Sequence, residues 1–275
     1  MHIILSIAHL TTANIPQSIR LETAFFLARI AQRYDLNHLL IGYIDAWIRP
    51  HNNSITKIGC EQWLYIAWQF GLDVYYTKLA NHLALHCQVD EHNALLKPGS
   101  EEAFTADDFP PRALFVIHAT RTKHITALLD TLTHLITHLL GPSACKIPTS
   151  PAPDREICTA RNNHGLQRYL VQHDLSPLHM HNRPVTRSVQ EILDVLQSTK
   201  LSDVLRRAGD DAGHEACRVD DELGTRVNKV VEEFVWALDR GLVAQIKWNS
   251  ARRGMSSGRG NLVNARLMEN EDCYA

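Results

Sequence analysis

The chain has 275 residues, of which 45% are hydrophobic and 21% charged, and its formal net charge is −2 at pH 7. This length allows one large hydrophobic core or two modest ones, and the nearly neutral charge gives the whole chain no electrostatic attraction for nucleic acid. Six cysteines are too few for a disulfide scaffold, and no apolar run approaches the roughly 18 residues of a membrane span, so we expect an intracellular protein, in the nucleus or the cytoplasm, that does not enter a membrane.

Helical patterns dominate the first 86 residues. Apolar residues recur there at intervals of three and four, the spacing of one buried helix face, and Pro50 with the polar residues after it interrupts them. After a short apolar helix or strand at the N-terminus, we expect helices over about 21–34, 36–48, 56–70 and 74–86. We expect the tryptophans Trp47, Trp63 and Trp68 to fill helix–helix contacts rather than to form an exposed binding patch.

The rest of the chain alternates helices with polar or proline-rich segments. Residues 88–112 are acidic and contain prolines, which predicts a loop. The proline-rich segment from Cys145 to Cys158 excludes a regular helix or an inner strand, because proline lacks the amide hydrogen. We expect helices over about 112–140, 164–173, 185–197 and 223–238. The sequence contains no long alternation of apolar and polar residues, so the predicted fold class is mostly α with very little β.

Four stretches in a fixed order carry a resemblance to a known family. They are IILSIAHLTTANIPQSIRLETAFFLARIAQRYD (3–35), EQWLYIAWQFGLDVYYTKLANHL (61–83), GLQRYLVQHDLSP followed by SVQEILDVLQSTK (165–200), and GHEACRV followed by a last helix ending DRGLVAQI (213–246). As an ordered set they resemble the BTB/POZ-domain proteins of filamentous fungi. The resemblance covers roughly residues 1–248, and it departs from the family at 174–177, where DLSP stands in place of a GLWP signal.

The resemblance implies the C-terminal helices of a BTB-like domain followed by a helical extension. The three-stranded sheet and the helices with which a BTB domain begins have no counterpart here, so we expect the N-terminal half of that domain to be missing. The expected organisation is 1–50 as the C-terminal part of a BTB/POZ-like domain, 51–140 as a helical extension, 141–250 as a helical C-terminal unit with zinc-clamped loops, and 251–275 as a disordered tail.

The candidate chemical site consists of Cys145, Cys158, His214 and Cys217. Zinc prefers four thiolate or imidazole ligands, usually supplied as close pairs, and His214-x-x-Cys217 is such a pair. Cys145 and Cys158 are further apart than usual, so spacing alone leaves open that the cysteines are separate buried thiols and the histidine an exposed loop residue. The resemblance implies the zinc set, because two cysteines and an H-x-x-C recur at matching places in the family. Four protein ligands leave no position for water, so the expected zinc is structural.

Histidine is unusually frequent, at 16 residues of 275. His82 and His86 stand four residues apart, as do His134 and His138, so each pair shares one helix face and could ligate a metal. No acidic residue lies between His134 and His138, so the zinc-protease pattern of two histidines with a general-base glutamate is absent from this pair. We expect both pairs to be partly exposed residues on helix faces.

We expect a non-enzymatic protein–protein interaction module, a BTB-like adaptor or regulator. The helix pairs of the first 86 residues contain no nucleophile, phosphate loop or paired acid and base. By analogy with the family, the expected partners are proteins, as a homo-oligomer or a cullin-type scaffold. One alternative is a zinc-stabilised, nucleic-acid-associated regulator that uses the arginines of the tail from Arg252. A second is a histidine-rich, metal-dependent hydrolase, which would need a pocket where several histidines meet.

Overall fold

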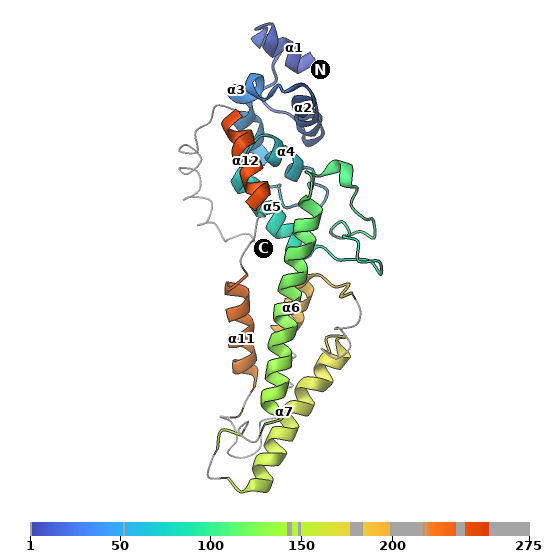
Figure 1. Cartoon of the computed structure of the whole chain (residues 1–275), viewed down its shortest axis with the longest axis vertical. Coiled ribbons are helices and arrows are strands. Elements are labelled where there is room, and N and C mark those ends of the chain that lie inside the picture. Colours follow the sequence, from blue (N-terminus) through green and yellow to red (C-terminus); the bar gives the residue numbers. More distant parts are fainter. Residues whose placement is uncertain are drawn as a thin grey trace. The chain divides into compact units, whose positions relative to one another are not determined.

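The computed structural model describes the chain as an assembly of helices (Figure 1). The described residues are 2–51, 53–141, 145–147, 150–176, 184–198, 217, 219–234 and 240–252. Among them 67% are helical and 2% are in strand conformation, without a sheet, which confirms the mostly α prediction. The chain forms two compact units: unit 1 comprises Met1–Leu83, Phe104–Ile117 and Trp236–Ala275, and unit 2 comprises Ala84–Ala103 and His118–Val235. The two units are defined by contacts, whereas the four segments expected from the sequence are defined by motif and composition. Those four segments therefore stay a prediction.

Unit 1 is built around short helices from the first third of the chain and one from its last part. They are α1 (His2–Ala8), α2 (Leu21–Tyr34), α3 (Asn37–Ile48), α4 (Trp63–Gln69), α5 (Asp73–His86, which continues into unit 2) and α12 (Arg240–Arg252), with the 3-10 turns η1 (Thr12–Asn14), η2 (Arg49–His51) and η3 (Ala106–Asp108). The side chains of Trp47, Trp63 and Trp68 are buried among them. The expected packing role of these tryptophans is therefore confirmed.

The chain turns sharply between α2 and α3. Asp35 adopts the left-handed conformation, with φ of 56°, and its amide donates to the carbonyl oxygen of Ala31. Helix α3 can then start at once, and its first residue, Asn37, is buried against the last residue of α4. There the Nδ2 of Asn37 donates to the carbonyl oxygen of Gln69 over 3.1 Å, and the Nε2 of Gln69 donates to the Oδ1 of Asn37 over 2.9 Å. This reciprocal amide pair satisfies polar groups that burial would otherwise penalise.

Helix α12 belongs to unit 1, although it follows unit 2 in the sequence. The sequence-based prediction did not separate it from the preceding helix. The expected helix over 223–238 is in fact α11 (Asp220–Glu232), and α12 is a second element after it. On α12 the Nδ2 of Asn249 donates to the carbonyl oxygen of Trp68 over 2.8 Å. The expected disordered tail (251–275) was wrong for its first two residues, because Ala251 and Arg252 are the last residues of α12, and 253–275 lie outside the described residues.

Unit 2 is a helical bundle around the long helix α6 (Ala113–Leu139, which begins in unit 1). Helices α7 (Ala152–Gln172), α9 (Val189–Leu196) and α11 pack along it (Figure 1). Their shared core is aliphatic and consists mainly of Ile125, Leu128, Leu132, Leu135, Leu166, Leu170, Val189, Ile192, Leu223 and Val227. The core keeps the helical spacing of three and four residues within each helix, so each helix contributes one apolar face.

Two helix starts differ from the expected ones. Helix α7 begins inside the proline-rich segment, at Ala152, directly after Pro151. Pro153 lies in the first turn, where backbone amides have no partner within the helix, so proline is tolerated there. Helix α4 begins at Trp63 and not near residue 56, because residues 53–58 form turns and Gly59 has a φ of 83°. In both cases the local backbone, not hydrophobic spacing, decides where the helix starts.

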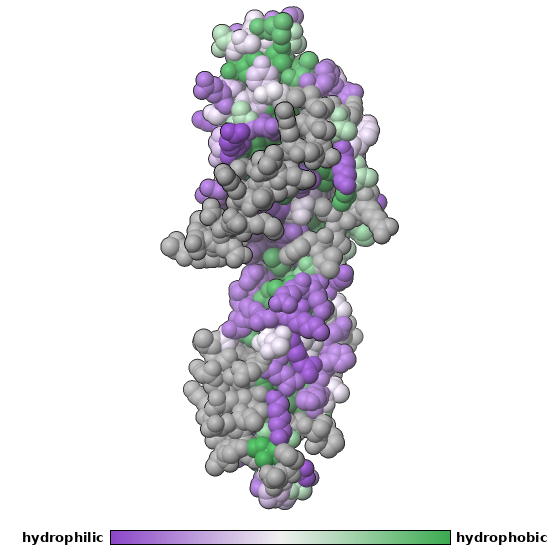
Figure 2. Space-filling model, turned by 90° about the vertical axis from the view of Figure 1, so that its left-hand side faces the viewer, coloured by the Kyte–Doolittle hydropathy of each residue, from purple (hydrophilic) through white to green (hydrophobic). Residues whose placement is uncertain are grey.

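Large apolar side chains reach the surface in both units, among them Leu10 and Phe26 in unit 1 and Leu140 in unit 2. Figure 2 shows hydrophobic surface (green) at the end where α1 lies, whereas hydrophilic surface (purple) covers most described residues of unit 2 on this face. Leu10 is 83% exposed and Phe26 on α2 is 61% exposed. Within the described ranges, no helix combines the length and the apolar character needed to cross a membrane.

Candidate metal centre

Three cysteines from separate parts of unit 2 meet in one buried cluster. Cys145 follows α6, Cys158 is on the second turn of α7, and Cys217 precedes α11. Their exposed fractions are 9%, 7% and 2%, and the three sulfur atoms all lie within 4.8 Å of one another. The Sγ atoms of Cys145 and Cys217 are 3.8 Å apart, too far for a disulfide and close enough to share one ion.

The local sequence explains why Cys158 faces inward. Cys158 and Asn162 are four residues apart on α7, and Leu166 continues the same face one turn later. All three side chains are buried, so α7 presents one continuous inner face to the bundle. Cys217 is placed similarly, because Val219 and Leu223 just after it are buried in the core of unit 2. The three cysteines form a small buried cluster of their own, distinct from the aliphatic core of unit 2, with Ile147 packed against it.

Hydrogen-bond donors surround the sulfur atoms. The backbone amide of Lys146 donates to the Sγ of Cys217 over 3.2 Å. The side-chain Nδ2 of Asn162 lies 3.8 Å from the Sγ of Cys158 and donates to the carbonyl oxygen of Cys217 over 3.1 Å. Donors of this kind favour the charged form of a sulfur ligand, because they place positive ends of dipoles against a thiolate.

The electrostatics without a cation favour thiols. Burial, followed by the neighbouring thiols of Cys217 and Cys145, raises the pKa of Cys158 to about 12. Three thiolates so close together in a dry site would repel one another. A bound cation reverses this balance, because metal binding releases the thiol protons. Cys158 is thus held as a thiol, and it can become a thiolate ligand when a metal ion enters.

A network of charged side chains lies at the edge of the site. The carboxylate of Glu222 on α11 accepts hydrogen bonds from Arg226, the shorter being 2.7 Å from Nη2. The same carboxylate lies 4.0 Å from the Nζ of Lys146 and 3.8 Å from the Nδ1 of His138. These groups are partly exposed, so their contribution to stability is small. They link α6, the segment next to Cys145, and α11 around the cluster.

Of the four ligands expected from the sequence, the structure brings three together. Cys145, Cys158 and Cys217 form the cluster and could bind a metal ion, whereas His214 lies outside the described residues. Sequence reasoning missed Asn162. Its position four residues after Cys158 was the available signal, but a buried asparagine cannot be told from an exposed one by spacing alone.

The histidine pairs do not form a second metal site in the described part of the chain. The only group there with three potential metal ligands is the cysteine cluster. His134 and His138 are exposed, and His82 and His86 are partly buried. The expectation that these histidines lie partly exposed on helix faces is confirmed.

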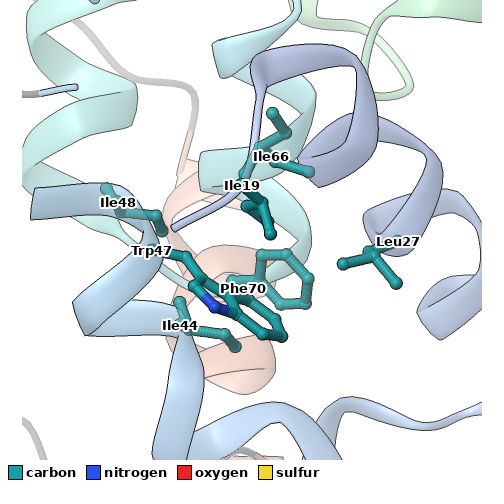
Figure 3. Close-up of a pocket in the computed structure, with 8 residues that line it drawn as sticks. Ile19, Leu27, Ile44, Trp47, Ile48, Ile66 and Phe70 are labelled. Carbon is teal, nitrogen blue, oxygen red and sulfur yellow. The ribbon is translucent and has the colours of Figure 1, made fainter. Parts of the chain in front are cut away.

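An apolar cavity in unit 1 carries no chemical groups for a reaction (Figure 3). It lies between α2, α3 and α4, with the ring of Trp47 facing into it. Its lining is Ile19, Ala24, Leu27, Ile44, Trp47, Ile48, Ile66 and Phe70. The cavity is therefore a small packing gap between helices, and no histidine lines it.

Comparisons with known proteins identify no relative. No protein-family model, no curated protein and no solved structure matches the chain. The resemblance to fungal BTB/POZ proteins accordingly stays a prediction from the sequence. The geometry of the cysteine cluster is what the structure contributes to the question of function.

Proposed function

We propose that the chain is a non-enzymatic protein-interaction module, a BTB-like adaptor or regulator, in which a structural zinc ion stabilises unit 2. Cys145, Cys158 and Cys217 supply three thiolates, and His214 is the fourth ligand expected from the sequence. The observation that carries the proposal is the convergence of three buried sulfur atoms from three chain segments.

The sulfur geometry fits zinc. A tetrahedron with Zn–S bonds of about 2.3 Å has edges between sulfur atoms of about 3.8 Å. The distance between the Sγ atoms of Cys145 and Cys217 is 3.8 Å, and the remaining sulfur–sulfur distances are at most 4.8 Å. The three sulfur atoms thus span approximately the trigonal face of such a tetrahedron. Thiolate-rich tetrahedral sites are characteristic of zinc among the common divalent metals.

The location of the site supports a structural role. Cys145 and Cys217 are 72 positions apart in the chain, so an ion that holds both removes much conformational freedom from the unfolded chain. A site with four protein ligands has no open position for a water molecule, which a catalytic zinc requires. The zinc would tie the segment after α6 and the start of α11 to α7.

Exposed apolar side chains support the interaction role. Several large apolar side chains of unit 1, among them Leu10 and Phe26, are mostly exposed, and contiguous apolar surface is where proteins make contacts. By the family resemblance the partner is a second copy of the chain or a cullin-type scaffold. Light scattering on the purified protein tests the first of these: a mass of two chains that falls to one in a Leu10→Asp, Phe26→Asp variant supports self-association, and a monomeric wild type opposes it.

Elemental analysis tests the zinc. Purified wild-type protein should contain about one zinc per chain, and a Cys158→Ala, Cys217→Ala variant should contain none. Cys60→Ala is the matched control, because Cys60 is a cysteine of unit 1 outside the cluster, and it should keep the zinc. A folded wild-type protein without metal would overturn the proposal. Salt-dependent binding to DNA or RNA that is lost on removal of residues 252–275 would instead support the nucleic-acid alternative.

A further inference from the structure

Cys145 and Cys217 are two free thiols whose sulfur atoms touch. They are 72 positions apart in the chain, yet their Sγ atoms lie 3.8 Å apart. The backbone amide of Lys146 donates to the Sγ of Cys217 over 3.2 Å, so this sulfur is held against the residue next to Cys145. A disulfide bond is about 2 Å long, so the two sulfur atoms need to approach by only about 1.8 Å to form one.

Cys158, the third sulfur of the cluster, is held more firmly than the other two. It lies on α7, and the regular backbone of the helix fixes the direction of its side chain. The Nδ2 of Asn162, on the same face of α7, lies 3.8 Å from its Sγ. Cys145 and Cys217 lie outside the α-helices, where the backbone can follow the sulfur atoms as they approach. The pair that closes most easily is therefore Cys145 with Cys217.

We propose that Cys145 and Cys217 are a redox pair, which a peroxide joins in a disulfide bond and thereby withdraws from the metal site. The loss of zinc on oxidation rests on the zinc site proposed above, whereas the disulfide needs only the two thiols. Zinc itself does not change its oxidation state, so the sulfur ligands carry the reaction. The disulfide would still join the segment after α6 to the segment before α11, and oxidation would exchange one cross-link of unit 2 for another.

The reaction of the zinc-free thiols with hydrogen peroxide has two steps. Within the pair, Cys145 is the more exposed residue, at 9% against 2% for Cys217, so we expect it to react first. The O–O bond breaks, one oxygen binds to the sulfur of Cys145 as a sulfenic acid, and the other leaves as water. The sulfur of Cys217 then binds to that of Cys145, and the sulfenic oxygen leaves as a second water with the proton of the Cys217 thiol. The two sulfur atoms lose two electrons, and the peroxide gains them.

Mass-spectrometric mapping of the cysteines tests the pair in the full-length chain. Zinc-free, reduced protein treated with hydrogen peroxide should lose the mass of two hydrogen atoms and stay a single chain. Trypsin cleaves after Lys146, Arg155 and Arg218, so it places the three cysteines of the cluster on separate peptides. The peptides of Cys145 and Cys217 should be joined, and Cys158 should still react with an alkylating reagent after unfolding.

Three variants serve as controls for this mapping. Cys217→Ala should form no disulfide within the cluster, whereas zinc-free Cys158→Ala should form the same one as the wild type. Cys60→Ala should also behave as the wild type, because Cys60 lies in unit 1. A wild-type disulfide through Cys158, a disulfide only between two chains, or oxidation without any disulfide would overturn the redox pair.

Release of zinc is measured on the zinc-loaded protein with a chromophoric zinc indicator. Peroxide should release about one zinc for each Cys145–Cys217 disulfide that forms, and a thiol reductant should restore both thiols and zinc binding. Zinc that leaves without this disulfide would overturn the proposal. A protein that forms the disulfide but never binds zinc would overturn the metal site and leave the redox pair standing. A protein that binds zinc but forms no disulfide would overturn the redox pair alone.

Discussion

Gly71 is the residue of unit 1 at which a side chain has no room. Its φ is 66°, in the region that favours glycine, and a β-carbon there would overlap the backbone nitrogen and Cα of Ser250 on α12. Gly71→Ala should therefore displace α12 and lower the free energy of unfolding by about 3 kcal/mol, as measured by urea denaturation. Gly42→Ala is the control, because nothing lies within 4 Å of a β-carbon there. Glycine within a helix is unfavourable, so that variant should be equally or more stable. Equal losses in both variants would contradict this account.

His124 is a buried residue whose charge state links stability to pH. Its ring stacks on Phe234 with centroids 3.9 Å apart, and burial, followed by the charge of Lys123, lowers its pKa to about 4. The unfolded chain takes up the proton near pH 6.5, so the stability that neutral His124 contributes is present above that pH and is lost as pH falls toward 4. The loss should reach about 3 kcal/mol.

Denaturant unfolding at pH 7.5 and pH 4.5 measures this effect of His124. His124→Phe preserves an aromatic ring against Phe234 but cannot take up a proton. The free energy of unfolding of the wild type, relative to that of the variant, should therefore be lower at pH 4.5 than at pH 7.5. Both proteins are compared in the same zinc state. A difference that does not change with pH would show that His124 is protonated equally in the folded and the unfolded chain.

Arg121 on α6 makes hydrogen bonds to two loops of unit 2. Its buried guanidinium donates to the carbonyl oxygens of Cys87 (3.0 Å), Arg187 (2.6 Å) and Val185. Arg121→Met should leave these acceptors unsatisfied and lower the free energy of unfolding by about 3 kcal/mol. Arg121→Lys should recover only part of it, because an ammonium group cannot reproduce the planar fork.

Hydrogen exchange provides a local measurement for Arg121. The amide of Val89 donates to the carbonyl oxygen of Thr186, a bond between the two loops that Arg121 holds. This amide should exchange much faster in Arg121→Met, whereas amides in the middle of α2, in unit 1, should keep their wild-type protection. Equal acceleration in both places would indicate a global effect instead of a local one.

Hydrophobic spacing predicts whole helices better than it predicts their ends. The expected helices over 21–34, 74–86 and 112–140 agree with the structure to within one residue, because each has a continuous apolar face. The start of α7 was missed because proline was read as a helix breaker, although a first turn tolerates it. The separation of α12 from α11 was missed because the break between them carries no proline or glycine signal before residue 240.

At the cysteine cluster, likewise, the sequence predicted the ligand residues but not the contacts around them. The H-x-x-C spacing pointed to Cys217, and the family resemblance added Cys145 and Cys158. The role of Asn162 depends on the approach of Cys217, which is 55 positions away in sequence. Contacts of this kind are set by tertiary packing, which no local pattern encodes.

The two units should respond differently to removal of the metal. The cysteine cluster belongs entirely to unit 2, whereas the four tryptophans in the described ranges, Trp47, Trp63, Trp68 and Trp248, belong to unit 1. Tryptophan fluorescence therefore reports on unit 1, and amide hydrogen exchange in α7 reports on unit 2. A strong chelator should destabilise unit 2 by about 3 kcal/mol or more, comparable to opening a long cross-linked loop.

The two signals can be followed in the same chelator titration. Protection of the α7 amides should fall as zinc is removed, and readdition of zinc should restore it. The midpoint of the fluorescence transition on heating should stay within a few degrees, because unit 1 loses no ligand. In the Cys158→Ala, Cys217→Ala variant the chelator should change neither signal. If the fluorescence midpoint falls together with the protection of the α7 amides, the two units unfold as one. The zinc site then stabilises the whole chain.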